Sequence, residues 1–219
     1  LQGDQVASLA VPECGTKFVR GMLEDSRPQT FSDLVRISGF SHGTNVWLDN
    51  AQDLIKNGTC KLNEAISTRD DVMNFLIHRG MDRKHSFFVM ENVRKGKGIE
   101  KRNKQGQATT EFEAEMRENN IPEWFIESCK KISYLFPRAH AVAYVMMAFR
   151  IAWFKVYHPL AFYAAYFSIR AKAFDLRIMT GDLNTQLKEF NRIKALDRGA
   201  SPKEKDLMSA LEVSMEMYQ

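Results

Sequence analysis

Helix-start signals recur along the whole 219-residue chain, and this feature most limits the folds it can adopt. Thr30 is followed three residues later by Asp33, and Ser201 is followed by Pro202 and then Glu204. This spacing is typical of a capping box, in which the two side chains satisfy backbone N–H groups of a first helical turn. The alternation of apolar and polar residues expected of strands is scarce. We therefore predict an all-α, multi-helix fold.

Glycine and proline set the expected helix boundaries. The helix that begins after Thr30 is expected to end at Gly39, because glycine is a poor helix former. The other helices are expected at residues 72–79, 82–94, 110–118, 122–132, 137–158, 160–171, 183–196 and from 202 onward. Two glycines interrupt the basic run at residues 94–98, so residues 96–108 are predicted to be a polar loop.

Composition restricts the class of protein only weakly. Hydrophobic residues make up 44% and charged residues 26% of the chain, as in ordinary globular proteins. A net charge of +4 permits a nucleic-acid partner without requiring one. The cysteines, Cys14, Cys60 and Cys129, are far apart and form no C-x-x-C pair, which fits a reducing cytoplasm. A start without Met and without a basic-then-apolar leader leads us to expect a fragment with no signal peptide.

The most apolar stretch covers residues 139–167. Arg150, Lys155 and Pro159 interrupt it. A membrane span needs about 20 mostly apolar residues without such interruptions. We therefore expect buried helices here and no membrane contact.

The sequence offers no catalytic residue and no metal ligand set. No two Asp residues stand two apart, as they do in an Asp-x-Asp metal site. Asp70 and Asp71 are adjacent, and adjacent side chains on a helix diverge by about 100°, so we interpret them as first-turn acids favoured by the helix dipole. The histidines are scattered, without metal-ligand spacing on one helix face. The motif G-x-x-x-x-G-K-[ST] is absent as well.

Two segments remain as candidates for binding an anion. The run RKGKG carries Arg94, Lys95 and Lys97, which form either a solvated surface loop or a contact to phosphates. In the stretch FPRAHAVAY, residues 136–144, Arg138 and His140 fall in a first helical turn, where backbone N–H groups favour an anion. Tyr144 follows His140 by one turn on the same face. The alternative for this stretch is a buried helix with a hydrogen-bonded histidine.

These segments together resemble the fingers of PolC-type DNA polymerase III alpha subunits. The resemblance spans almost the whole chain in one order. It is carried by PECGTKFVR (12–20), LVRISG (34–39) with SHGT (41–44), RDD (69–71), VRKGKG (93–98), FPRAHAVAY (136–144) with VMMAFR (145–150), FKVYHP (154–159) and ASPKEK (200–205).

The resemblance implies a role for individual residues. Arg94, Lys95 and Lys97 would face the triphosphate or template backbone, and Arg138 and His140 would meet the incoming nucleotide. Arg69 and Arg79 would be weaker phosphate contacts. The walls of the base pocket would come from Tyr144, His42, Ser41 and Thr44.

The resemblance also implies the setting. The intact protein would be a cytoplasmic DNA-directed DNA polymerase with a 3′–5′ exonuclease elsewhere in the chain. Its partners would be primer–template DNA, dNTP, the sliding clamp and other replisome subunits. Mg²⁺ would be held by palm aspartates outside this chain, so the fragment alone is expected to bind no cofactor and to be inactive. Residues 1–170 would form the fingers, with a basic loop at 94–108, and residues 171–219 would lead toward a tandem helix-hairpin-helix module. The alternative is a non-enzymatic helical module that binds nucleic acid or protein.

Overall fold

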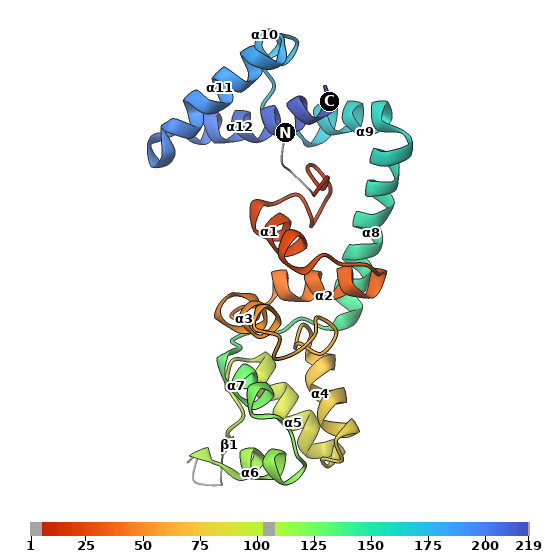
Figure 1. Ribbon diagram of the computed structural model, residues 1–219, viewed down its shortest axis with the longest axis vertical. Helices are drawn as coiled ribbons and strands as arrows, with labels where there is room; N and C mark the ends of the chain where they lie inside the picture. Colours follow the sequence, from red (N-terminus) through yellow and green to blue (C-terminus); the bar gives the residue numbers. More distant parts are fainter. Residues whose placement is uncertain (1–5, 103–107, 219) are drawn as a thin grey trace. The chain divides into compact units, whose positions relative to one another are not determined.

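The computed structural model describes residues 6–102 and 108–218, and helices dominate it (Figure 1). The predicted all-α class is confirmed. The α-helices are α1 (Lys17–Ser26), α2 (Phe31–His42), α3 (Gln52–Lys56), α4 (Arg69–His78), α5 (Arg83–Arg94), α6 (Glu111–Glu118), α7 (Glu123–Lys131), α8 (Arg138–Tyr157), α9 (Pro159–Ala165), α10 (Leu176–Met179), α11 (Leu183–Ala195) and α12 (Pro202–Met217). Short π-helical or 3₁₀ turns are η1 (Trp47–Ala51), η2 (Tyr166–Arg170) and η3 (Asp197–Gly199).

A two-residue antiparallel ladder interrupts the loop expected at residues 96–108. Strand β1 (Lys101–Arg102) pairs with β2 (Ala108–Thr109). This pairing was not predicted, because backbone pairing of such short strands leaves no apolar pattern in the sequence. Residues 103–107, part of the basic loop expected at residues 94–108, lie outside the described residues.

The chain divides into two compact units. One contains residues 1–20 and 147–219, and the other contains residues 21–146. The division falls inside α1 and α8. The boundary expected between residues 170 and 171 stays a prediction.

Both capping boxes expected from the sequence are present. The Thr30 hydroxyl accepts the backbone N–H of Asp33 at 3.1 Å, and the Asp33 carboxylate accepts that of Thr30 at 3.0 Å. Ser201 and Glu204 make the same exchange at the start of α12. Pro122, in contrast, lies one position before α7 rather than at its first residue.

Gly39 does not end α2, contrary to the prediction. The helix continues to His42 and its cap is Gly43. A Cβ atom at Gly39 would lie 2.5 Å from the carbonyl oxygen of Ser67. This glycine therefore allows the loop before α4 to approach α2 closely, which helix propensity alone does not reveal.

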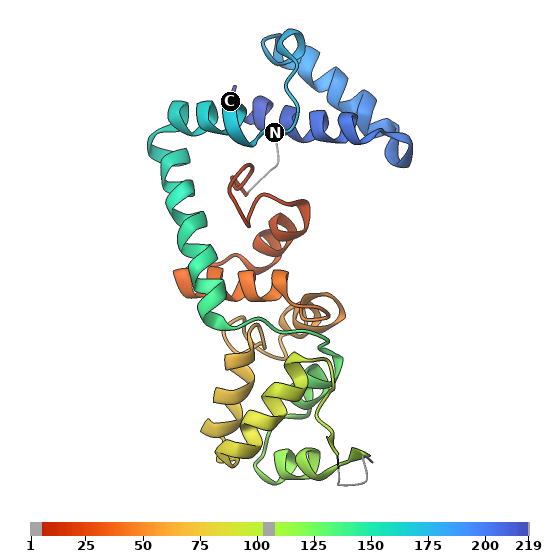
Figure 2. The same ribbon diagram turned by 180° about the vertical axis from the view of Figure 1, so that it is seen from behind.

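Helices α4 and α5 lie side by side in the unit of residues 21–146 (Figures 1 and 2). Leu76 on α4 and Val89 and Val93 on α5 are fully buried. The ring of Phe75 stacks on that of Phe125 in α7, with centroids 4.1 Å apart. This packing holds α4 and α7 together, and α4 carries the acidic residues of the site described below.

In the other unit, α11 and α12 form a hairpin joined by η3. Its core includes Met179, Ala210 and Leu211. Lys155 of α8 joins three segments of this unit: its ammonium donates to the carbonyls of Ala7 and Leu9 and pairs with Glu216 at 2.7 Å. Burial lowers the pKa of Lys155.

The apolar stretch at residues 139–167 is less buried than predicted. Ala141, Val145 and Ala148 form a buried stripe, whereas Phe149 and Val156 are 55% and 69% exposed. Helix α8 carries apolar residues on all of its faces, so packing along one stripe leaves the apolar residues of the other faces exposed. By length and composition alone, α8 could cross a membrane. A core helix of a larger protein meets the same criterion, so the criterion does not distinguish the two.

Candidate functional site

The segment between α7 and α8, residues 132–137, brings the motifs SHGT, RKGKG and RDD together. The N–H of Thr44 donates to Tyr134 O at 3.0 Å, and the N–H of Leu135 donates to Arg94 O at 3.4 Å. The N–H of Arg69 donates to Phe136 O at 3.0 Å. This one connecting segment therefore holds SHGT, RKGKG and RDD near the start of α8.

Two glycines make this close approach possible. A Cβ at Gly43 would lie 2.9 Å from the carbonyl oxygen of Tyr134, and one at Gly96 would lie 2.6 Å from that of Ser133. Gly96 also has φ of +68°, a conformation that other residues rarely adopt. The glycines of the two motifs are thus required by the backbone contacts to residues 133 and 134.

An aromatic and imidazole cluster covers the first turns of α8. The His140 ring stacks on Phe136 with centroids 4.9 Å apart, and it lies 4.5 Å from the ring of Tyr144. His42, at the end of α2, lies 5.7 Å from Tyr144 and 6.0 Å from His140. The predicted base-pocket residues His42 and Tyr144 are therefore neighbours, and both lie close to the ring of His140.

His42 is oriented by its own helix. Its Nδ1 lies 2.7 Å from Ser38 O, a distance that assigns the proton to Nδ1, and the Ser41 hydroxyl donates to the same carbonyl at 3.0 Å. Ser41 therefore supports the His42 position from within α2. Thr44 is exposed, and its backbone is engaged with residues 133 and 134.

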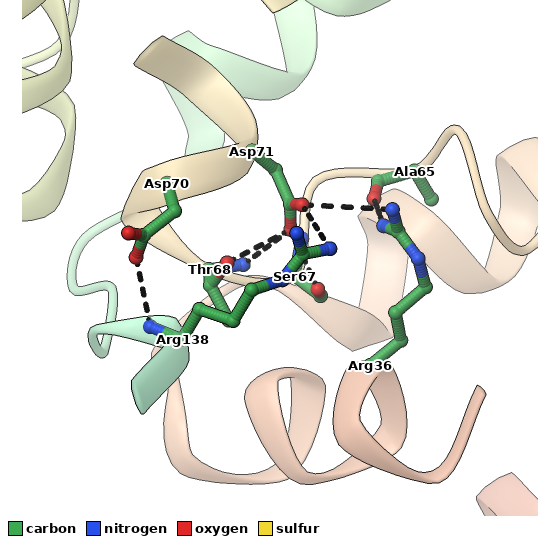
Figure 3. A network of polar contacts seen from close by, with 7 residues as sticks. All are labelled: Arg36, Ala65, Ser67, Thr68, Asp70, Asp71 and Arg138. Atoms are coloured by element: carbon green, nitrogen blue, oxygen red, sulfur yellow. Dashed lines mark hydrogen bonds and ion pairs between the residues drawn. The ribbon is translucent and has the colours of Figure 1, made fainter. Parts of the chain in front are cut away.

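Asp71 is the centre of a polar network that joins α2, α4 and α8 (Figure 3). Its Oδ2 accepts four hydrogen bonds from the backbone N–H groups and hydroxyls of Ser67 and Thr68, at 2.7–3.0 Å. Its Oδ1 pairs with Arg138 at 3.3 Å and with Arg36 at 3.5 Å. The first-turn role predicted for Asp71 is present, but the pairing across helices was not foreseen.

Asp70 points to α8 rather than along its own helix (Figure 3). Its Oδ2 accepts the backbone N–H of Arg138 at 2.8 Å. A carboxylate of the chain thus occupies one of the anion-binding positions expected at this helix start. The Arg138 side chain remains 40% exposed, so a ligand anion would meet the side chain rather than this N–H group.

The cations of RKGKG are not equivalent. Arg94 and Lys95 both pair with Glu91 one turn earlier on α5, Lys95 at 2.9 Å. The hydrogen bond from Arg94 is the main cause that lowers the pKa of Glu91 to about 2. Lys97 is exposed, and within the described residues its side chain has no ion pair. Among the described residues, Lys97 is therefore the one of the three whose charge is not paired with a carboxylate.

The two weaker candidates lie at opposite ends of α4. Arg69 is adjacent to the site through its backbone bond to Phe136. Arg79 lies about 15 Å further along the helix axis, with its guanidinium over the Phe75 ring and directed to Asn120 O. The structure does not bring Arg79 together with Arg138.

Sequence reasoning missed Arg36. Its side chain is only 11% exposed, and its guanidinium donates to Ala65 O at 2.9 Å and pairs with Asp71. A charged residue between the apolar Val35 and Ile37 was the available signal, because a buried arginine needs partners. The roles of Glu91 and of Phe136 had no such signal.

The sequence of this chain matches a known protein family. The family model described as the bacterial DNA polymerase III alpha subunit finger domain matches residues 3–120. The chain belongs to this finger-domain family. The finger-domain match covers SHGT, RDD and RKGKG, three of the segments that meet at residues 132–137.

Curated relatives extend the likeness over nearly the whole finger-domain chain. It is 55% identical over 216 residues to DNA polymerase III PolC-type from Caldanaerobacter subterraneus subsp. tengcongensis, covering 99% of this chain and 15% of the relative. The Bacillus subtilis protein of that name is 52% identical over 215 residues, 98% of this chain and 14% of the relative. The protein of that name from Thermotoga maritima is 55% identical over 212 residues, which cover 97% of this chain and 15% of the relative. The chain therefore spans about one seventh of these relatives.

Proposed function

We propose that this finger domain binds the triphosphate of the incoming dNTP and the neighbouring template in a PolC-type replicative DNA polymerase. Arg138 carries the proposal. Its side chain is partly exposed at the start of α8, the helix whose first turns also carry the rings of His140 and Tyr144, and the backbone segment before it also supports RKGKG. A cation next to stacking surfaces suits a phosphate joined to a base.

The proposed chemistry is electrostatic. Negative charge develops on the pyrophosphate leaving group during phosphoryl transfer, and donors already in place stabilise it. Arg138 would donate to a phosphate oxygen, and Lys97 would add positive charge from its exposed position. His42 and Tyr144 would supply ring surfaces to the nucleotide base, with Ser41 and Thr44 at the edge. Arg94, Lys95 and Arg69 complete the proposed set, while Arg79 would act only on a more distant phosphate.

The acids of the site do not fit a Mg²⁺ ion. Both Asp71 oxygens accept bonds from several donors, and Asp70 accepts the Arg138 N–H. Among the described residues, no group of three or more His, Cys, Asp or Glu side chains could hold a metal. We propose that aspartates outside this chain hold the Mg²⁺ of the intact enzyme, and we assign no metal step to this domain.

The proposed setting is a cytoplasmic replisome. Primer–template DNA and dNTP would contact this domain, and the sliding clamp, the exonuclease and other subunits would act through the rest of the protein. Arg150 and Lys155 on α8 are reasons to place that helix within a large water-soluble enzyme rather than a membrane.

The test is single-turnover incorporation by the full-length polymerase carrying Arg138→Ala. Loss of one transition-state donor should lower the incorporation efficiency by about 2–4 kcal/mol, or roughly 30- to 1,000-fold. Arg83→Ala is the matched control, because Arg83 is an exposed arginine at the start of α5. An unchanged rate for Arg138→Ala, with DNA binding intact, would favour the alternative of a non-enzymatic binding module.

A further inference from the structure

Asp71 divides its two carboxylate oxygens between two tasks. Oδ2 is saturated by four donors from the buried Ser67 and Thr68, so the carboxylate has a set orientation. Oδ1 is shared by the guanidinium groups of Arg36 and Arg138 (Figure 3). We propose that Asp71 is a positioning residue that sets the Arg138 guanidinium for the nucleotide, an inference that rests on the proposed function of Arg138.

Sharing one oxygen leaves Arg138 held but incompletely neutralised. Charge-assisted N–H···O bonds are usually about 2.7–2.9 Å long. The Arg138 contact is 3.3 Å, and the Arg36 contact to the same oxygen is 3.5 Å. Because Arg36 competes for this oxygen, Arg138 keeps positive charge that a phosphate can use.

Arg138 is also fixed at its backbone. Asp70 accepts its N–H at 2.8 Å, so the main chain and the guanidinium are both attached to the first turn of α4. A guanidinium has five N–H donors, and one of them contacts Asp71. With 40% of the side chain exposed, the others can face a ligand. A donor side chain that is already ordered before the ligand binds loses less conformational entropy on binding.

Of the two arginines that share Asp71 Oδ1, Arg36 is the buried one. Its Nε is buried without a hydrogen-bond partner among the described residues, one of its terminal nitrogens donates to Ala65 O and the other pairs with Asp71. Arg36 therefore cannot turn outward to replace Arg138 at the surface. Only the Arg138 side of the shared carboxylate is open to a nucleotide.

A double-mutant cycle in the full-length polymerase tests this role. The variants are Asp71→Asn, Arg138→Ala and their combination, and the measurement is the apparent Kd for dNTP and the maximal rate in single-turnover incorporation. We expect Asp71→Asn to weaken dNTP binding about fivefold or more, and to have no further effect once Arg138 is Ala.

Asp33→Asn is the matched control. Asp33 is the capping acid of α2 and accepts the N–H groups of Gln29 and Thr30, as Asp71 accepts those of Ser67 and Thr68 before α4. Within the part of the chain that the structure describes, Asp33 makes no hydrogen bond or ion pair with Arg138. Its effect reports the loss of a helix cap alone. Equal changes in dNTP binding for Asp33→Asn and Asp71→Asn would overturn the positioning role.

The remaining outcomes separate the two proposals. If Arg138→Ala leaves incorporation unchanged, the proposed function fails. If Arg138→Ala is defective but Asp71→Asn weakens binding equally in both backgrounds, only the positioning role fails.

Arg138→Lys covers the case in which Asp71→Asn does not fold. It keeps the charge and loses the fork geometry. We expect a defect within threefold of Arg138→Ala, and wild-type behaviour of the lysine variant would contradict the role of Asp71.

Discussion

The carboxylate of Asp70 accepts the backbone N–H of Arg138 at 2.8 Å, across 68 residues of sequence. This bond attaches the start of α8 to the start of α4. It also places a carboxylate of the chain itself where helix geometry alone would favour a ligand anion. The partly exposed side chain of Arg138, rather than the helix end, is therefore the phosphate contact that we propose.

Gly39 is expected to be intolerant of any side chain. Gly39→Ala would place a Cβ 2.5 Å from Ser67 O and should lower the free energy of unfolding by about 1–3 kcal/mol. Gly21→Ala in α1 is the control, since its Cβ would meet nothing within 4 Å and should stabilise the chain by up to about 1 kcal/mol. Urea denaturation of the 219-residue chain followed by circular dichroism measures both. Equal effects of the two substitutions would show that α2 and the 67–68 loop are not in close contact.

Glu91 is expected to limit DNA binding by holding Arg94 and Lys95. Glu91→Gln removes the carboxylate charge, so both cations become available to phosphates. We expect the full-length polymerase to bind primer–template several-fold more tightly at low salt, with the slope of log K against log salt steeper by about 1–2. Fluorescence anisotropy across a salt series measures this.

Glu113→Gln is the control for that experiment. Glu113 also pairs with two cations, Arg117 and Lys130, but these lie on α6 and α7. Its substitution should leave DNA affinity unchanged. An equal gain from Glu113→Gln would show that the effect of Glu91→Gln comes from net charge rather than from RKGKG.

Glu91 also predicts an acid-dependent part of the stability. Its pKa is lowered to about 2 from 4.5, chiefly by the hydrogen bond from Arg94. A lowered pKa in the folded state stabilises the protein above the unfolded value, so this contribution is complete above pH 4.5 and is lost as the pH falls toward 2. Because Lys95 is 47% exposed and solvent screens the pair, we expect about 1 kcal/mol.

The measurement is the difference in unfolding free energy between the wild-type chain and Glu91→Gln at several pH values. The difference should be largest near pH 6 and should shrink below pH 4. A difference in unfolding free energy that stays constant down to pH 3 would mean that folding does not lower the pKa of Glu91.

Much of the helical order could be predicted because its signals are local. The capping residues Thr30 and Ser201 mark their helices through contacts made three residues away. Gly39 was misjudged because its role depends on Ser67, which approaches from another part of the chain. The exposure of Phe149 could not be foreseen either, since an apolar residue does not reveal what covers it.

The site shows the same limit. The rings of His140 and Tyr144 were placed together by the one-turn spacing, and this neighbourhood is present. The pairing of Asp71 with Arg36 and Arg138 depends on three helices meeting, so no local pattern encodes it. Where partners are distant in sequence, residue type suggests the chemistry and only the fold selects the partner.

The most direct measurement is a structure of the full-length polymerase with primer–template DNA and a matched dNTP. We predict that the Arg138 guanidinium lies within about 3 Å of a triphosphate oxygen, with the base near Tyr144 and His42. A triphosphate bound elsewhere, with Arg138 still paired to Asp71 and no ligand near it, would contradict the proposed role of this domain.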